Sequence, residues 1–144
     1  MTALYSPSRD DARRFLVAAW AKRRAGEPLS ALEALAADII GRHPEYHVLV
    51  EDPERSLHRD WSPERGESNP FLHLALHLAV AEQLAVDQPA GIAAEYARLC
   101  AAWGDEHAAQ HAVVECLGEV LWQAQRLGGP PDGALYVDCL RRRR

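Results

Sequence analysis

The amino-acid sequence predicts an all-α protein, a helical bundle of about five to seven helices. Apolar residues recur at helical spacing along most of the 144 residues. No run of alternating β-branched residues is long enough to form a sheet. Helix caps and glycine or proline stops separate the periodic segments. With 48% apolar and 26% charged residues, a chain of this length is expected to form a single domain over residues 1–144.

The first predicted helix runs from the capping sequence at residues 8–11 to about Ala25. Its exposed face is expected to be basic, with Arg13, Arg14, Lys22, Arg23 and Arg24. The second predicted helix starts at a capping box, Ser30 with Glu33, and runs to about His43. Pro44 cannot continue that helix, so it is expected to open a short one over residues 44–50.

Residues 51–69 contain two prolines, one glycine and nine charged residues. This composition predicts a long surface loop with one turn of helix at most, and the loop is a candidate lid.

Two segments in the second half are apolar on nearly every face and are expected to lie at the centre of the bundle. The first covers residues 70–86 and follows Asn69, a good N-cap. The second follows Asp105 as N-cap and ends before the break at residues 128–131. A helix from Pro89 to Trp103 and a short final helix are also predicted.

Charge and composition exclude several classes of protein. A net charge of −5 disfavours a nucleic-acid partner, because such domains carry basic surfaces. The polar N-terminal region and the interrupted apolar stretches indicate neither secretion nor a membrane span. Cys100, Cys116 and Cys139 are an odd, widely spaced set that predicts neither a disulfide framework nor a zinc ribbon. They suit a reducing compartment, so a cytoplasmic protein is expected.

Six of the seven histidines form pairs four residues apart: His43/His47, His73/His77 and His107/His111. This spacing places two imidazoles on adjacent turns of a helix, where their nitrogens can bind one metal ion. Two of the pairs lie in the two apolar helices. Metal ligands of helical bundles project into the core from such helices, so the pairs indicate a metal site.

The polar stripe of the second apolar helix continues from His111 to Glu115 and Glu119. An unpaired carboxylate in an apolar segment carries a desolvation cost on the order of several kcal/mol. Glu115 is therefore expected to be neutral, ion-paired or metal-bound. Because Pro44 interrupts the first pair, His47 is a better candidate ligand than His43.

The predicted ligands are His73, His77, His107, His111 and Glu115, completed by His47 or Glu119. Nitrogen-rich ligation with one or two carboxylates suits a divalent transition metal, iron or zinc first and nickel or manganese next. With an open coordination position, the metal could activate water or dioxygen in a hydrolytic or oxygen-using reaction on a small molecule or a protein.

A non-catalytic interpretation of the same residues stays open. His–Glu hydrogen bonds between packed helices would satisfy the same groups without a metal. Such a helical interaction protein is expected to carry an exposed apolar patch or to form a homodimer.

Four long segments resemble, in order, a proteobacterial family known as domain of unknown function 1841. They are SPSRDDARRFLVAAWAKRRAGEPLSALEALAADIIGRHPEYH, EDPERSLHRDW, NPFLHLALHLAVAEQLAVDQPAGI and EHAAQHAVVECLGEVLWQAQR. The resemblance covers nearly the whole chain and implies a bacterial, cytoplasmic protein, with no particular chemistry. Histidine placement and predicted fold class also resemble hemerythrin-like and DinB-like helical-bundle metalloproteins, which is an analogy of fold.

Overall fold

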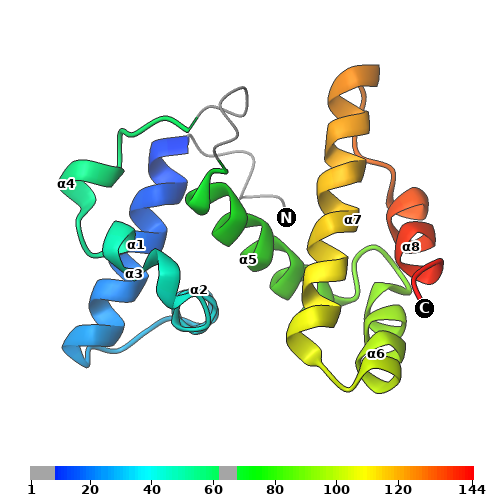
Figure 1. Ribbon diagram of the computed structural model, residues 1–144, viewed down its shortest axis with the longest axis horizontal. Helices are drawn as coiled ribbons and strands as arrows, with labels where there is room; N and C mark the ends of the chain where they lie inside the picture. Colours follow the sequence, from blue (N-terminus) through cyan, green and yellow to red (C-terminus); the bar gives the residue numbers. More distant parts are fainter. Residues whose placement is uncertain (1–8, 62–67) are drawn as a thin grey trace. The chain divides into compact units, whose positions relative to one another are not determined.

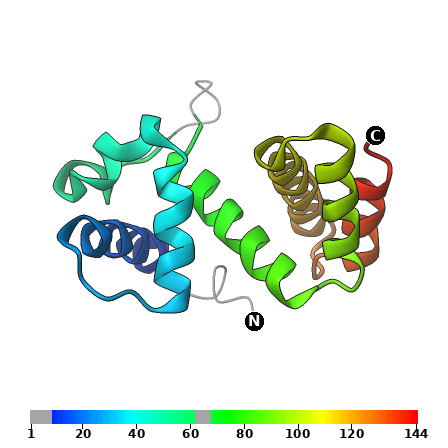
Figure 2. The same cartoon turned by 90° about the horizontal axis from the view of Figure 1, so that it is seen from below.

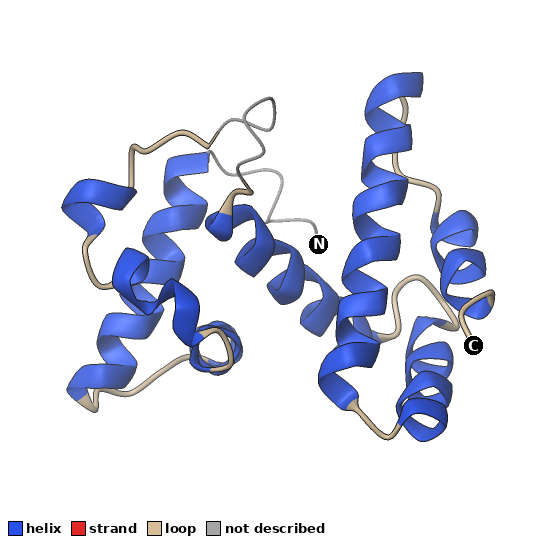
Figure 3. Cartoon of the chain, in the orientation of Figure 1, coloured by secondary structure: helices blue, strands red, loops and turns tan. Residues whose placement is uncertain are grey.

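A computed structural model describes residues 9–61 and 68–144, and within these residues it contains helices and no strands (Figure 3). The longer helices are α1 (Arg9–Ala25), α2 (Ala31–Gly41), α5 (Pro70–Val86), α6 (Ile92–Trp103), α7 (Glu106–Leu127) and α8 (Gly133–Arg141). The shorter elements are a 3-10 helix, η1 (Pro44–Tyr46), and two single-turn α-helices, α3 (His47–Val50) and α4 (Pro53–Ser56). The all-α prediction is confirmed. No helix in this part of the chain combines the length and the apolar character needed to cross a bilayer.

The chain divides into two compact units, residues 1–78 and residues 79–144. The boundary falls inside α5, so the first unit contains α1 to α4 and the start of α5, and the second contains the rest of α5 and α6 to α8 (Figure 1). The expectation of one domain over the whole chain stays a prediction.

Helices α1 and α2 pack against each other in the first unit. Ser30 starts α2 with the predicted capping box, in which the Ser30 amide donates to Glu33 Oε1 at 2.8 Å. The second oxygen of this carboxylate lies 2.6 Å from Nζ of Lys22 on α1. The hydrogen bond from Lys22 is the main reason why the pKa of Glu33 lies below its ordinary value of 4.5. One carboxylate thus caps α2 and connects it to α1.

Arg13 lies in the interior of the first unit and is 1% exposed, so the prediction that it belongs to an exposed basic face is wrong. Its Nη1 donates hydrogen bonds to the carbonyl oxygens of Leu57 and Arg59 at 2.9 and 2.8 Å. Its guanidinium carbon also lies 5.2 Å from the ring of Trp61 and 5.0 Å from that of Phe71. These partners come from segments distant in sequence, and helical periodicity does not reveal them.

The segment that follows Pro44 forms short helical turns, as predicted, in η1 and α3. The single turn expected within residues 51–69 is α4, where the buried hydroxyl of Ser56 donates to the Leu49 carbonyl at 2.7 Å. Part of the candidate lid, residues 62–67, lies outside the described residues. Asn69 caps α5 as predicted, because its Oδ1 accepts a hydrogen bond from the Leu72 amide at 3.1 Å.

Helices α6, α7 and α8 pack against one another in the second unit (Figure 2). Asp105 caps α7 as predicted, accepting a hydrogen bond from the Ala108 amide at 3.0 Å. Gly104 and Gly128 end α6 and α7 with φ of 64° and 73°, a left-handed conformation that favours glycine. The predicted starts and stops of α7 are therefore confirmed.

Helix α6 begins at Ile92 and not at the predicted Pro89. Gly91 precedes it with φ of 97°, which no residue within an α-helix adopts. The Asp87 carboxylate accepts hydrogen bonds from the amides of Gly91 and Ala93 at 3.2 and 3.0 Å. The Asp87 carboxylate thus accepts hydrogen bonds from amides at the start of α6, and the helix does not begin at the proline that the sequence indicates.

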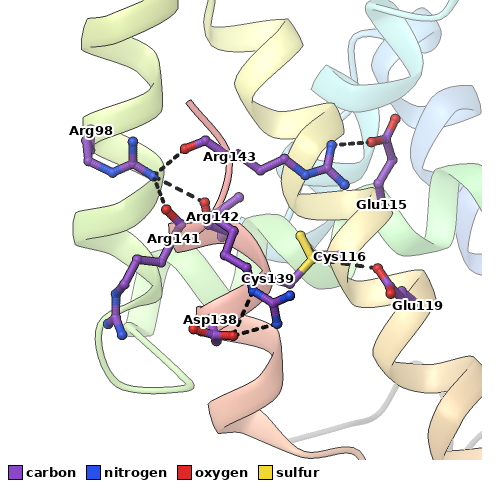
Figure 4. Close-up of a disulfide and its surroundings, with 10 residues drawn as sticks. Arg98, Glu115, Cys116, Glu119, Asp138, Cys139, Arg141, Arg142 and Arg143 are labelled. Atoms are coloured by element: carbon purple, nitrogen blue, oxygen red, sulfur yellow. Dashed lines mark hydrogen bonds and ion pairs between the residues drawn. A yellow bond between two sulfur atoms is a disulfide. The ribbon is translucent and has the colours of Figure 1, made fainter.

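Cys116 of α7 and Cys139 of α8 form a disulfide, with their Cα atoms 5.8 Å apart (Figure 4). The sequence pattern predicts no disulfide framework, yet helix packing brings these two residues together across a separation of 23 positions. Cys100 is the free cysteine. The prediction that the cysteines form no disulfide is therefore wrong for Cys116 and Cys139, while the expected compartment stays a prediction.

Candidate metal centre

Three histidines of the first unit lie together, and we call His43, His73 and His77 the three-histidine cluster. His43 follows α2 and is the N-cap residue of η1. His73 and His77 lie four residues apart on α5. His77 is fully buried, His43 is 3% exposed and His73 is half-buried. The cluster therefore combines buried imidazoles with one side chain that solvent reaches.

The spacing of the ring nitrogens fits one metal ion. One ring nitrogen of each histidine lies within 4.8 Å of those of the other two. The Nε2 atoms of His73 and His77 are 3.2 Å apart. Two nitrogens bound to one tetrahedral zinc ion at about 2.0–2.1 Å would lie about 3.3 Å from each other. The centroid of the His43 ring lies 5.2 Å from that of His73 and 4.8 Å from that of His77.

The hydrogen bond of His43 fixes its tautomer. Nδ1 lies 2.8 Å from the carbonyl oxygen of Ile39, in the last turn of α2. Because a carbonyl oxygen only accepts, Nδ1 carries the proton, and in the neutral ring Nε2 carries the lone pair. A backbone carbonyl that holds the second nitrogen of a histidine is the usual outer partner of a metal-bound imidazole.

Tyr46 forms one wall of the three-histidine cluster. Its ring stacks on that of His43, with centroids 5.6 Å apart and an interplanar angle of 2°. It also meets the His73 ring edge-on at 5.9 Å. Burial, more than the neighbouring Glu45, raises the pKa of the phenol above its ordinary value of 10.0, so Tyr46 is neutral at physiological pH. The wall is therefore aromatic and uncharged.

His47, which the sequence favours over His43, has other partners. Its Nε2 lies 2.8 Å from the Ile40 carbonyl oxygen, and its ring packs on Trp20 with centroids 4.5 Å apart. The structure thus brings His43, and not His47, beside the α5 pair. Pro44 disfavours the helical conformation at the preceding residue, and His43, with φ of −123° and ψ of 65°, lies outside the helical region. A histidine directly before a helix-breaking proline is the signal that could have identified it.

The predicted pair His107/His111 forms in the second unit, on the first turns of α7. The ring centroids are 4.4 Å apart with an interplanar angle of 64°, as expected for i, i+4 neighbours on a helix. His107 is exposed and His111 is half-buried.

The two predicted carboxylates of α7 meet partners on or just after α8. Glu115 forms an ion pair with Arg143 at 2.7 Å, one of the three states that the sequence leaves open. Its side chain is 63% exposed, so the apolar surroundings inferred for it are not formed. Oε2 of Glu119, also exposed, lies 3.8 Å from Sγ of Cys139.

Comparison with known proteins identifies the family to which the chain belongs. The family model described as "Domain of unknown function (DUF1841)" matches residues 8–142, nearly the whole chain. The search of curated proteins and the search of solved structures each found no match.

Proposed function

Because the chain belongs to the domain of unknown function 1841 family, whose description names no activity, we propose a function from its residues. The protein binds one divalent transition metal ion through His43, His73 and His77. The observation that carries the proposal is the convergence of three imidazoles whose ring nitrogens lie within 4.8 Å of one another.

Two features favour a metal over a purely hydrogen-bonded network. The tautomer of His43, set by the Ile39 carbonyl, is the one in which Nε2 can donate its lone pair to an ion. In addition, the 3.2 Å separation of the His73 and His77 nitrogens is close to the edge of a tetrahedral zinc site, about 3.3 Å. The alternative at this distance is a hydrogen bond between the two Nε2 atoms, in which one of them carries a proton and the other does not.

The ligand set also suggests a class of chemistry. Three neutral imidazoles leave the charge of a divalent ion uncompensated and leave at least one coordination position for water or substrate. A zinc ion held by these histidines would supply an acidified water for hydrolysis, whereas an iron ion would supply chemistry with dioxygen. Zinc or iron is the expected metal, and hydrolysis is the reaction class to test first.

The first experiment is elemental analysis of tag-free, full-length protein purified without chelator. We expect near-stoichiometric zinc or iron in the wild type and its loss in His77→Gln and in His43→Gln. Glutamine is close to histidine in size and polarity, so the interior of the unit is disturbed little. Circular dichroism checks that each variant is folded.

Two histidines of the same unit provide matched controls. His47→Gln removes an imidazole that packs on Trp20, and His58→Gln removes an exposed one. Both variants are expected to retain the metal. A folded wild type that carries no metal and gains no thermal stability from added Zn²⁺, Fe²⁺, Ni²⁺ or Mn²⁺ would contradict the proposal and leave the non-catalytic interaction protein as the alternative.

Participation of His107, His111, Glu115 and Glu119 stays a prediction from the sequence. The same elemental analysis of His111→Gln tests it, because loss of metal there would extend the ligand set to the second unit. For Glu115 and Glu119, the observed contacts with Arg143 and Cys139 favour a role in the packing of α8. A cytoplasmic, bacterial protein likewise stays a prediction.

A further inference from the structure

The disulfide of the second unit lies beside an open hollow. Cys139, together with Glu119, Arg142 and Arg143, lines a depression of about 220 Å³. Figure 4 shows these side chains around the link between α7 and α8. The site is separate in sequence and in chemistry from the three-histidine cluster, and it does not rest on the proposed metal.

The two sulfur-bearing residues differ in access. Cys116 is fully buried on the face of α7 that packs in the unit. Cys139 is half-buried and lines the hollow. Thiol–disulfide exchange requires in-line approach of a thiolate to one sulfur, so access decides which sulfur is attacked. The hollow gives a small nucleophile a route to Cys139.

Charged groups surround the route. Two guanidinium groups line the hollow, that of Arg142 paired with Asp138 at 2.6 Å and that of Arg143 paired with Glu115 at 2.7 Å. The carboxylate of Glu119, 3.8 Å from the Cys139 sulfur, faces the same position. Because the attacking species is an anion, the arginines favour its approach and the glutamate opposes it.

We propose that Cys116–Cys139 is an exchangeable disulfide, that small thiols are its reactants and that Cys139 is the sulfur they attack. A thiolate RS⁻ forms a bond to Cys139 Sγ while the Cys116–Cys139 bond breaks. Cys116 leaves with the electron pair as a thiolate and takes up a proton. A second RS⁻ attacks the sulfur of the R group, releases RSSR and leaves Cys139 as a thiolate, which is protonated. Two small thiols are oxidised and the protein disulfide is reduced.

The reduced state is also accommodated. A Cys139 thiol at this position lies within reach of Glu119 Oε2 for a weak S–H···O hydrogen bond. Reduction removes the covalent link of α8 to α7, while the ion pairs of Arg142 and Arg143 need no change. Through exchange, the concentration of small thiols in solution would therefore determine whether α8 is covalently linked to α7.

The test identifies the attacked sulfur. The full chain carrying Cys100→Ser, so that no third thiol interferes, is exposed in its oxidised form to 2-mercaptoethanol and quenched in acid. Remaining thiols are alkylated with N-ethylmaleimide. Trypsin cleaves after Arg126 and separates the two cysteines, so mass spectrometry reads each one. We expect mercaptoethanol on Cys139 and maleimide on Cys116.

Rates test the surroundings. Glu119→Gln is expected to accelerate reduction about fivefold, the effect of one unit charge about 4 Å away in water. Arg143→Gln is expected to slow it, and Arg126→Gln, a charge change on the same helix beside Trp122, is expected to leave it unchanged. The proposal is overturned if mercaptoethanol is found on Cys116, if the disulfide is reduced only in denaturant, or if neither Glu119→Gln nor Arg143→Gln changes the rate of reduction.

Discussion

The two units of this chain are stabilised by different kinds of interaction. Four of the five buried polar side chains in the described residues lie in the first unit: Arg13, His43, Ser56 and His77. The second unit buries one, Gln110, and joins α7 to α8 by a disulfide. Buried polar groups are stable only when hydrogen-bond partners lie in defined directions. Apolar contacts between helices have no such directional requirement, and the disulfide stabilises the folded state by restricting the unfolded chain. The first unit is therefore the one whose stability should respond most to loss of single polar atoms.

Removal of the buried arginine is expected to have the largest effect. In Arg13→Ala, the Leu57 and Arg59 carbonyls lose their donor and two aromatic rings lose a cation. Two part-buried acceptors that lose their donor, and the packing lost with the buried Arg13 side chain, together should lower the free energy of unfolding by about 4 kcal/mol. Urea denaturation of the wild type and of Arg13→Ala measures this change in the free energy of unfolding. The neighbouring exposed Arg14→Ala should change stability by less than about 0.5 kcal/mol, and equal losses in both would contradict the role given to Arg13.

Loss of the disulfide is expected to rank second and to act on the second unit. The link closes a loop across 23 positions, which in the chain-entropy model stabilises the folded state by about 3 kcal/mol. Cys116→Ser with Cys139→Ser should therefore unfold at lower urea concentration than the wild type. Thiol titration of the wild type, unfolded in urea without reductant, is expected to find one reactive cysteine, Cys100. Three titratable thiols in the freshly purified, unfolded and unreduced protein would show that the link is not formed.

Metal binding should stabilise the first unit in a pH-dependent manner. At free metal about 100 times its Kd, the gain is about 2.7 kcal/mol. Ligation requires neutral imidazoles, so this gain is present at neutral pH and is lost as the pH falls below about 6, where free histidine takes up a proton. Melting temperatures with and without zinc, compared from pH 5 to pH 8, measure the effect. His77→Gln should show no gain at any pH.

The smallest expected effect concerns an exposed ion-pair network of the second unit. Hydrogen bonds from Arg98, and then from Arg141, hold the pKa of Glu95 below its ordinary value of 4.5. Its stabilising contribution is therefore present above pH 4.5 and is lost as the pH falls through the lowered pKa. Glu95→Gln should cost less than about 1 kcal/mol at pH 7. Urea midpoints of the two proteins should converge as the pH falls through the lowered pKa of Glu95, and a difference that stays constant from neutral pH to the acid end of the titration would rule out this electrostatic origin.

Local signals in the sequence identified most of the helix ends. Ser30 with Glu33, Asn69 and Asp105 are caps whose partners lie within three residues, so their patterns could be read directly. The proline pattern predicts the start of α6 three residues early, because it does not reveal that the Asp87 carboxylate accepts the hydrogen bonds of the first turn. The helical periodicity of α5 also placed His73 and His77 on adjacent turns.

The remaining features depend on contacts between distant segments. Burial of Arg13 needs Trp61 and Phe71, and the disulfide needs α8 to pack on α7. The choice of His43 over His47 depends on how the chain turns at Pro44. A single sequence carries the residue types for each of these contacts but not the geometry that selects among them.

The hydrogen bond between His43 and the Ile39 carbonyl has a consequence for motion. Nδ1 of this imidazole is hydrogen-bonded to the last turn of α2, and the same ring contacts His73 and His77 in the three-histidine cluster. Fraying of that turn and departure of His43 from the cluster are therefore one event. Occupancy of the cluster would slow amide hydrogen exchange at the end of α2, so the helix terminus would report whether the site is filled.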